Sequence, residues 1–173
     1  MQRRTLILVS AIAVAGLFAG GMAAVGGSKP GAPADVRRSG LHVSDGDSFT
    51  LDGQRIRLFG IDAPELAQGC TGADGRPYPC GRAAADALTR LLSEGRPDCA
   101  ERDRDAYGRS VAVCTIAGRD LNRAMVSEGW AVAYTRYSRD YVRDEAEARR
   151  ARLGLWQGRF ERPEQYRVEH RRG

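Results

Sequence analysis

Short stretches in which apolar and polar residues alternate begin at Leu41, and this is the pattern of half-buried β-strands. Leu41 to Leu51 predicts a strand with a tight bend at Asp45-Gly46, and Asp52-Gly53 is a hairpin turn signal directly after it. Gln54 to Ile61 predicts the return strand, because its apolar residues fall on alternate positions. The folded region is therefore expected to begin with adjacent antiparallel segments.

Three later segments carry apolar residues at helical spacing. Gly81 to Ser93 predicts the first helix, with an apolar stripe along one side. Asp120 to Glu128 predicts the second, because aspartate is a good N-cap residue and the glycine after Glu128 ends a helix. Ser138 to Leu153 predicts the third for the same two reasons, with serine as the cap and a glycine after it.

The remaining segments connect these helices. Arg96 to Arg104 and Arg109 to Ile116 predict the two strands of a hairpin, and Trp130 to Thr135 predicts a short strand. Asp62 to Pro79 is rich in glycine and proline and predicts a loop. Short strands with turn signals, closed off by helices, predict an α+β fold in which helices pack on a small β-barrel.

The N-terminus combines a short basic start with a long apolar stretch, as secretory signals do. Arg3 and Arg4 are the charged side chains that precede Lys29. We expect residues 1–26 to be a cleaved signal peptide or a retained membrane anchor, because residues 5–25 are long enough to span a bilayer. In both cases the rest of the chain is exported, to the periplasm or the medium or tethered to the inner membrane.

The composition changes twice along the rest of the chain. Residues 27–38 are rich in glycine and proline and predict a linker. The folded domain is expected over residues 39–160. Residues 161–173 are dense in charge, and we expect them to form a loosely ordered tail.

If the chain is exported, its four cysteines are expected to form two disulfides, because disulfides persist outside the cytoplasm. Four cysteines allow three pairings. Cys99 and Cys114 are equidistant from the turn sequence at residues 105–108, so they face each other across a hairpin. Cys70 and Cys80 then form the second disulfide. A zinc site is the alternative, but the sequence has no Cys-x2-Cys pair and its histidines are far away.

Composition limits the classes of protein that remain. Hydrophobic residues make up 42% of the 173 residues and charged residues 28%, which excludes a disordered chain and a multispanning membrane protein. The formal net charge is +5, and Lys29 is the one lysine beside 26 arginines. Arginine binds phosphate in a bidentate way, but a GC-rich genome also encodes many arginines. The charge alone therefore does not indicate a nucleic-acid partner.

Several acidic and basic residues together indicate a chemistry that none of them indicates alone. Asp47 and Asp62 lie near the ends of adjacent antiparallel segments, so both carboxylates can reach one cation. Oxygen ligands without histidine or cysteine suit Ca²⁺ or Mg²⁺. Glu65 follows closely enough to hold a water beside that ion, and Arg57 and Arg109 can point at one anion. Together these are the parts needed to hydrolyse a phosphodiester.

The same residues carry a resemblance to the thermonuclease (staphylococcal nuclease-like) family, and to its exported bacterial branch with extra cysteines. The resemblance covers roughly Ser39 to Trp156. The matching segments, in order, are Val43–Ser48, Arg57–Glu65 and Asp105–Arg109, followed by weaker matches at Leu121-Asn122, Gly129–Tyr134 and Gly154–Trp156. It implies a five-stranded OB-type β-barrel with three packed helices. It also implies a monomeric Ca²⁺-dependent nuclease that acts on DNA and RNA and leaves 3′-phosphate ends.

The resemblance further implies roles for single residues. Asp47, Asp62 and the backbone carbonyl of Ala63 would ligate calcium, with Asp45 behind them. Glu65 would be the general base that activates water. Two arginines would stabilise the charge on five-coordinate phosphorus: Arg57 and Arg109.

Tyr107 and Tyr134 would line the nucleotide pocket, where aromatic faces stack on a base. Beyond Tyr134, either Arg136 or Tyr137 would complete this pocket. A lysine that family members often carry beside the pocket tyrosine is replaced by Ala106. This loss and the anchor-like leader motivate an alternative, a non-catalytic OB module of the cell envelope that binds nucleic acid or a partner.

Overall fold

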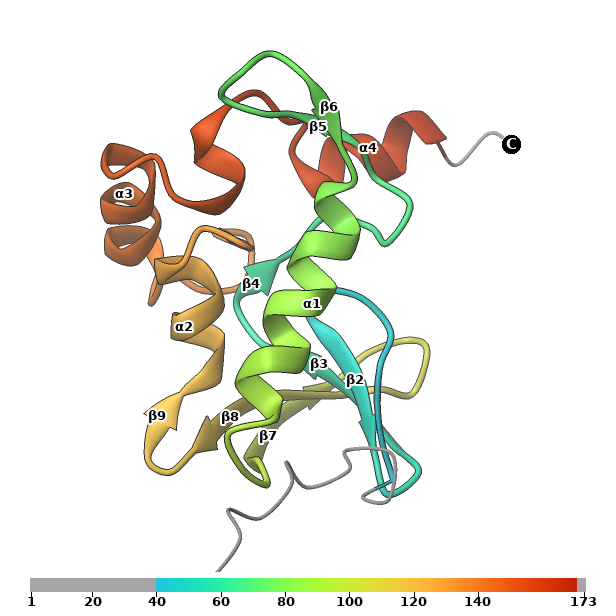
Figure 1. The fold of residues 1–173 in the computed structure, drawn as a ribbon. Helices are drawn as coiled ribbons and strands as arrows, with labels where there is room; N and C mark the ends of the chain where they lie inside the picture. The colour runs from blue at the N-terminus through green and yellow to red at the C-terminus, as the bar shows by residue number, and fades with distance from the viewer. Residues whose placement is uncertain (1–39, 171–173) are drawn as a thin grey trace, which may run out of the picture. The chain divides into compact units, whose positions relative to one another are not determined.

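The computed structural model of the protein describes residues 40–170 (Figure 1). Its main sheet has the strand order β1-β2-β3-β8-β7, and β9 also pairs with β8. The β3–β8 pair is parallel and the other pairs are antiparallel. The strands of this sheet are β1 (Leu41–Val43), β2 (Ser48–Leu51), β3 (Gln54–Leu58), β7 (Asp98–Arg104), β8 (Ser110–Ile116) and β9 (Arg119–Asp120).

Two small antiparallel sheets and the helices complete the described chain. One sheet pairs β4 (Ile61–Asp62) with β10 (Val132–Ala133), and the other pairs β5 (Cys70–Thr71) with β6 (Pro77–Tyr78). The helices are α1 (Cys80–Leu92), α2 (Leu121–Ser127), α3 (Val142–Arg150), the 3₁₀ helix η2 (Gly154–Gln157) and α4 (Pro163–His170). The predicted α+β class is confirmed, and the sheet order is consistent with an OB-type fold.

The first predicted strand folds back on itself at its bend, since Leu41 pairs with Leu51 across β1 and β2. The predicted return strand is wrong in one respect, because it breaks after Leu58. Gly60 has a φ of +73°, which interrupts the strand, and the chain resumes as β4 against β10. This break turns Asp62 away from the main sheet and into the second one.

The predicted helices differ from the observed ones mainly at their ends. Asp120 caps α2 as expected, because its side chain accepts a hydrogen bond from the Arg123 N–H at 2.9 Å. The prediction for Ser138 to Leu153 is wrong at both ends, since α3 covers Val142–Arg150. Ser138 instead accepts from the N–H of Asp140 in the turn that precedes the helix.

The segment expected to be a loosely ordered tail contains a fourth α-helix, α4. Pro163 stands at its first position, where a missing N–H costs nothing because that group has no partner inside a helix. Within residues 40–170 no helix combines the length and the apolar character needed to cross a bilayer. The predicted leader, anchor and linker, residues 1–38, lie outside the described residues.

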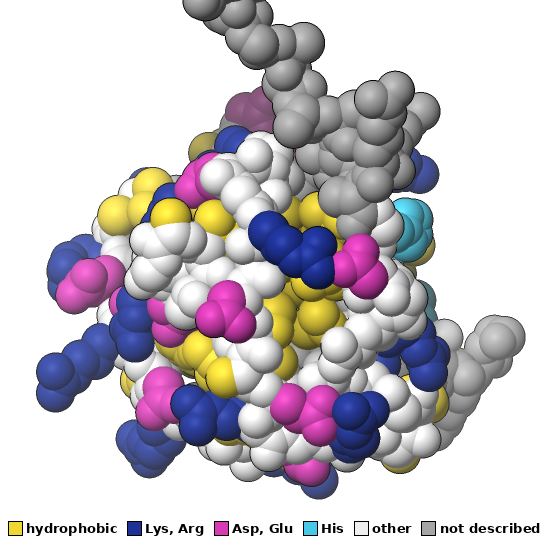
Figure 2. All heavy atoms as spheres, turned by 90° about the horizontal axis from the view of Figure 1, so that it is seen from below, with side chains coloured by type: hydrophobic (Ala, Val, Ile, Leu, Met, Phe, Trp, Pro, Cys, Tyr) yellow, Lys and Arg dark blue, Asp and Glu magenta, His cyan; other side chains and the backbone are white. Residues whose placement is uncertain are grey.

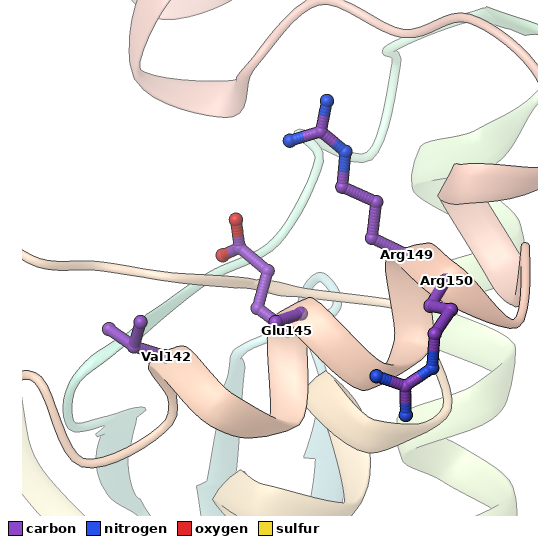
Figure 3. A pocket seen from close by; sticks show the side chains of 5 residues that line it. Val142, Glu145, Arg149 and Arg150 are labelled. Atoms are coloured by element: carbon purple, nitrogen blue, oxygen red, sulfur yellow. The ribbon is translucent and has the colours of Figure 1, made fainter.

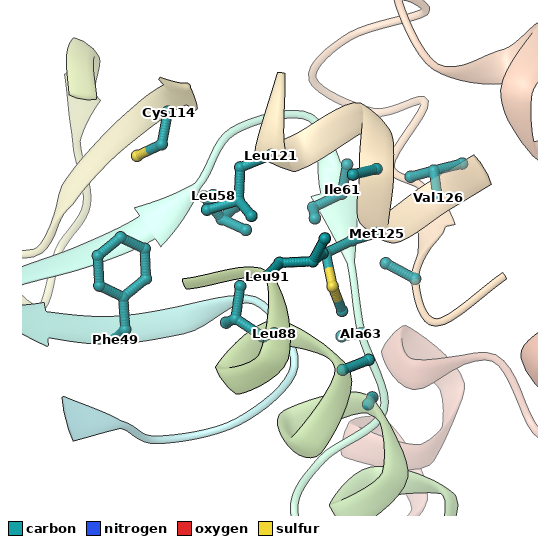
Figure 4. Packing of buried hydrophobic residues seen from close by; sticks show 14 of the residues in the cluster. Phe49, Leu58, Ile61, Ala63, Leu88, Leu91, Cys114, Leu121, Met125 and Val126 are labelled. Carbon is teal, nitrogen blue, oxygen red and sulfur yellow. The ribbon is translucent and has the colours of Figure 1, made fainter. Parts of the chain in front are cut away.

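The core forms where α1 and α2 cover the main sheet. Figure 4 shows Leu88 and Leu91 of α1 and Met125 of α2 pointing into the same space beside Leu58. Alternate residues of β8 are buried, as expected for a strand with one face against the core. Burying each large apolar side chain contributes about 1.5–3 kcal/mol, so this layer fixes how the strands lie under the helices.

Both predicted disulfides are present. Cys99 and Cys114 are directly paired in the β7–β8 register, with 4.0 Å between their Cα atoms. The bond between Cys70 and Cys80 joins β5 to the first residue of α1. Each closes a short loop and in the chain-entropy account adds about 3 kcal/mol to stability.

Asn122 links α2 to the sheet and supplies a first testable prediction. It is fully buried, its Oδ1 accepts from the Cys114 N–H at 3.1 Å, and its Nδ2 donates to the Phe59 and Ala112 carbonyls. Asn122→Leu leaves the Cys114 N–H without its partner, so the free energy of unfolding should fall by about 2–3 kcal/mol in urea denaturation.

The control is Arg82→Gln, an exposed residue of α1, which should change that free energy by no more than about 0.5 kcal/mol. Equal stability of Asn122→Leu and the unaltered protein would contradict the structural role given to Asn122.

Candidate active site

The turn between β1 and β2 holds Asp47 in a buried position. The Asp47 N–H donates to the Asp45 carboxylate at 3.0 Å, which closes the turn. A Cβ on Gly46 would lie 2.7 Å from the Cβ atoms of both Ala63 and Ala84, so the turn packs directly on α1 and on the residue after β4. The glycine thus allows an approach that brings Asp47 to the segment containing Asp62.

Asp47 itself is only 5% exposed and its carboxylate is held on both oxygens. Its Oδ2 accepts from the Ala63 N–H at 2.7 Å, and its Oδ1 accepts from the Ser48 hydroxyl at 3.0 Å. The Ala63 amide therefore fixes Asp47 beside the Asp62–Ala63 backbone, as a shared ligand site requires.

Arg57, at the end of β3, lies between the two predicted metal ligands. Its Nη1 forms an ion pair with Asp47, and its Nη2 donates to Asp62 Oδ1 at 2.9 Å. Asp62 is 1% exposed. Burial alone would lower the pKa of Arg57, but the charges of Asp47 and Asp62 outweigh it and raise that pKa. The guanidinium thus stays charged in a largely buried site.

Arg109 joins the same network through a hydroxyl. Its Nη1 donates to the Ser48 oxygen at 3.3 Å, and Ser48 in turn donates to Asp47. Its Nε donates to Asp105 at 2.6 Å, which fixes the side chain at the start of β8. The parallel pairing of β3 with β8 sets Arg57 opposite Val111 and so brings the two predicted phosphate-binding arginines to one end of the sheet.

The predicted nucleotide-pocket residues divide into two groups. Tyr107 is 68% exposed at the β7–β8 corner, and the Arg109 guanidinium carbon lies 5.6 Å from its ring centroid. Tyr134 packs edge-to-face against Tyr137, with 4.9 Å between the ring centroids. Arg136 meets the Tyr134 group through Glu164 of α4, because one Glu164 carboxylate oxygen lies 3.6 Å from Arg136 Nη1 and 3.4 Å from the Tyr134 hydroxyl.

Sequence reasoning missed Arg167. From α4 its Nη1 donates to Asp62 Oδ1 and Glu65 Oε1, each at 3.0 Å, and its Nη2 donates to Asp62 Oδ2 at 2.9 Å. Two signals were available: Pro163 is a typical first helical residue, and Glu164 and Arg167 stand three apart and so share a helix face.

The donor set fits a hard divalent cation. Asp47 and Asp62 are two buried carboxylates on either side of one guanidinium, and no histidine or cysteine accompanies them. Among residues 40–170 no three aspartate, glutamate, histidine or cysteine side chains converge as metal ligands. The expected set requires only two carboxylates and a backbone carbonyl, and such oxygen ligands suit Ca²⁺ or Mg²⁺.

A separate hollow lies along α3 and is lined by Val142, Glu145, Ala146, Arg149 and Arg150 (Figure 3). Glu145 and Arg149 extend from the helix toward the same side. Both are already engaged, because Glu145 accepts from the Ala133 N–H and Arg149 lies over the Trp156 ring. This hollow contains none of the residues that the sequence analysis selected.

One face of the protein carries charges of both signs (Figure 2). On the face of residues 40–170 that Figure 2 shows, acidic and basic side chains alternate around patches of hydrophobic atoms. Neither sign of charge dominates the face in Figure 2, so this face does not by itself indicate a nucleic-acid-binding surface.

The family described as “Staphylococcal nuclease homologue” matches residues 55–158 of this chain. The protein belongs to the staphylococcal nuclease homologue family. The match contains Arg57, Asp62, Glu65 and Arg109 and ends before α4.

Three relatives illustrate the range of this family. The chain is 37% identical over 122 residues to “Succinoglycan biosynthesis protein ExoI” of Rhizobium meliloti (strain 1021), covering 69% of the chain and 64% of the relative. It is 30% identical over 123 residues to an “Uncharacterized endonuclease” of Haemophilus influenzae, covering 67% and 64%. It is 32% identical over 140 residues to “Micrococcal nuclease” of Shigella flexneri, covering 71% and 75%. The chain thus spans less than two thirds of the first two relatives.

Asp45→Asn tests the electrostatics of this family member's site. Burial, with the negative charge of Asp47, raises the pKa of Asp45 from its ordinary 3.8 to about 7. The folded state therefore binds this proton more tightly than the unfolded state, and the stability that it contributes is lost as pH rises from about 4 to about 7. An asparagine keeps an oxygen for the Asp47 N–H but cannot ionise.

The stability difference between Asp45→Asn and the unaltered protein should therefore shift in favour of the variant between pH 4 and pH 7.5. Urea denaturation in the presence of a chelator measures it, with the exposed Asp86→Asn on α1 as the control. A parallel pH dependence in all three proteins would contradict the raised pKa.

Proposed function

We propose that the protein is a Ca²⁺-dependent nuclease that hydrolyses phosphodiester bonds of DNA and RNA. The observation that carries the proposal is the buried network in which Arg57 pairs with both Asp47 and Asp62 while Arg109 reaches Asp47 through Ser48. Two cation ligands and two anion-binding arginines thus lie in one connected cluster. Family membership and relatives named as nucleases support the same activity.

Asp47, Asp62 and the carbonyl of Ala63 are the residues proposed to hold the metal. When bound there, Ca²⁺ would supply positive charge to a phosphate oxygen and lower the pKa of a nearby water. Asp45 supports Asp47 from behind through its hydrogen bond to the Asp47 N–H. Small shifts of the β1–β2 turn would therefore weaken the site.

Glu65 is the proposed general base. Its side chain is 38% exposed, in contrast to the buried Asp47 and Asp62, so a water molecule can reach it. Its backbone is clamped, because a Cβ on Gly81 at the start of α1 would lie 1.8 Å from the Glu65 carbonyl oxygen. A carboxylate on a fixed backbone beside an anion-binding cluster is suited to take a proton from water.

The proposed reaction breaks the bond between phosphorus and the 5′ oxygen. Water attacks phosphorus, its proton passes to Glu65, and the leaving 5′ oxygen takes up a proton from solvent. Arg57 and Arg109 bind the phosphate oxygens as negative charge builds up on them, which stabilises the transition state more than the ground state. The products would be a 3′-phosphate and a 5′-hydroxyl.

Substrate and location form the remaining part of the proposal. Tyr107 lies beside Arg109, and Tyr134 with Tyr137 offers a second aromatic surface for a base. We expect a monomer that acts outside the cytoplasm, either released or tethered through residues 5–25. The two disulfides support an oxidising compartment.

Glu65→Gln tests the proposed base. The amide cannot take the proton of water, so cleavage of single-stranded DNA in Ca²⁺ should slow by about 10³-fold. The control is Glu94→Gln, an exposed residue just beyond the C-terminal end of α1 that pairs with Arg90 and Arg119, and it should cleave normally. Excess chelator should abolish cleavage by the unaltered protein. Undiminished cleavage by Glu65→Gln, or activity that is insensitive to chelator, would refute the proposal.

The chemistry of the fragment ends tests the direction of bond breaking. Mass spectrometry of fragments from a short DNA and a matching RNA should find 3′-phosphate and 5′-hydroxyl ends in both. Fragments with 5′-phosphates would contradict the attack geometry. Nucleic acid that binds without being cut would instead favour the non-catalytic OB module.

A further inference from the structure

The chain that leads into α4 is tied firmly to the body of the protein. Thr71 and Arg159 exchange backbone hydrogen bonds of 2.8 and 2.9 Å, and the Gln68 side chain donates to the Glu161 carbonyl at 2.8 Å. Thr71 belongs to β5, which the Cys70–Cys80 disulfide joins to α1. Figure 1 shows α4 beside the β5–β6 hairpin. The N-terminal end of α4 thus has a fixed position.

The helix itself is held differently. Pro163 is its one buried residue, and Val168 is 65% exposed, so little apolar surface keeps α4 in place. The ion pairs and side-chain hydrogen bonds that join α4 to the rest of the protein fall on the candidate site. Glu164 lies 3.4 Å from the Tyr134 hydroxyl and 3.6 Å from Arg136, and Arg167 binds Asp62 and Glu65.

Arg167 uses the oxygens of Asp62 that a metal would need. Asp62 Oδ1 accepts from both Arg57 and Arg167, and Oδ2 accepts from Arg167 at 2.9 Å. Oδ2 keeps a second acceptor site, but a cation there would lie against the positively charged Arg167 guanidinium, so its binding favours withdrawal of Arg167 from Asp62. The same guanidinium holds Glu65 Oε1 at 3.0 Å, so in this arrangement the proposed base is engaged as well.

We propose that α4 is a displaceable lid, in which Arg167 and a divalent cation are competing partners of Asp62. Cation binding releases Arg167, frees Glu65 and loosens α4 from the site. The N-terminal end of α4 stays anchored through the pairing of Thr71 with Arg159. This inference rests on the proposed metal site, but its claim concerns α4, which lies outside the residues that match the family. The result is a nuclease whose resting state is closed by its own C-terminal helix.

Calorimetric titration of the full-length protein with Ca²⁺ tests the competition. Charge-assisted hydrogen bonds to a carboxylate are strong, so Arg167→Gln should bind Ca²⁺ about tenfold more tightly than the unaltered protein. Arg167→Lys keeps the charge but loses the bidentate contact, so its Ca²⁺ affinity should lie between those of Arg167→Gln and the unaltered protein. Arg90→Gln, on α1, removes the same charge from a surface ion pair and controls for net charge.

Hydrogen exchange of the unaltered protein tests the release without any substitution. Saturating Ca²⁺ should speed amide exchange over residues 163–170 and leave α1 protected. Equal Ca²⁺ affinity of Arg167→Gln and the unaltered protein, or slower α4 exchange in Ca²⁺, would overturn the lid.

The same titration separates this inference from the proposed function. If Ca²⁺ binds and supports cleavage but Arg167→Gln gains no affinity, the lid fails and the nuclease proposal stands. If neither protein binds Ca²⁺ and cleavage ignores chelator, both fail. Asp47→Asn is the reference, since it should lose Ca²⁺ binding whichever residue occupies position 167.

Discussion

A buried guanidinium between two buried carboxylates is the interaction on which the rest of this structure depends. Removing Arg57, Asp47 and Asp62 from water carries a large desolvation cost, which their mutual attraction offsets only when the remaining oxygens and protons also find partners. The Ala63 amide and the Ser48 hydroxyl provide such partners for Asp47. Losing one member of a buried pair typically costs about 3–5 kcal/mol, so the loops around the site have little freedom to rearrange.

The same buried network fixes the positions of the few residues to which the proposed chemistry is assigned. Donors and acceptors that are already oriented need not reorganise when charge develops on a substrate, and this is the main source of electrostatic stabilisation in enzymes. As a consequence, a metal ion or substrate must displace contacts that these side chains already make with one another. Asp47 and Asp62 hold each other through Arg57, whereas Glu65, at the edge of the cluster, stays accessible to water.

Local signals were enough for much of the fold. The Asp45-Gly46 bend, the Asp120 cap and the equidistance of Cys99 and Cys114 from one turn each depend on neighbouring residues, and the structure bears all of them out. The break at Gly60 was not predictable in this way, because it depends on β4 finding its partner β10. The start of α3 was missed because Ser138 caps a turn rather than the helix.

The same difference between local signals and long-range pairing applies to the candidate site. Residues within recognisable motifs, such as Asp47, Asp62 and Arg109, lie together as the spacing suggested. Arg167 could not be found by motif, since it lies beyond the family match and reaches Asp62 only because the Thr71–Arg159 pairing brings the chain back. A charged segment of low apolar content looks like solvated tail unless that long-range pairing is known.

The parallel pairing of β3 with β8 has a consequence for how the protein becomes active. Asp47, Arg57 and Asp62 come from the β1–β2 turn, β3 and β4, whereas Arg109 directly precedes β8, which follows much later in the sequence. Pairings between distant segments form late in folding, because the intervening chain must be ordered first. A partly folded chain in which β3 and β8 are not yet paired therefore has the Asp47–Arg57–Asp62 cluster without Arg109. The second anion-binding group of the proposed site thus takes its place only once the main sheet is complete.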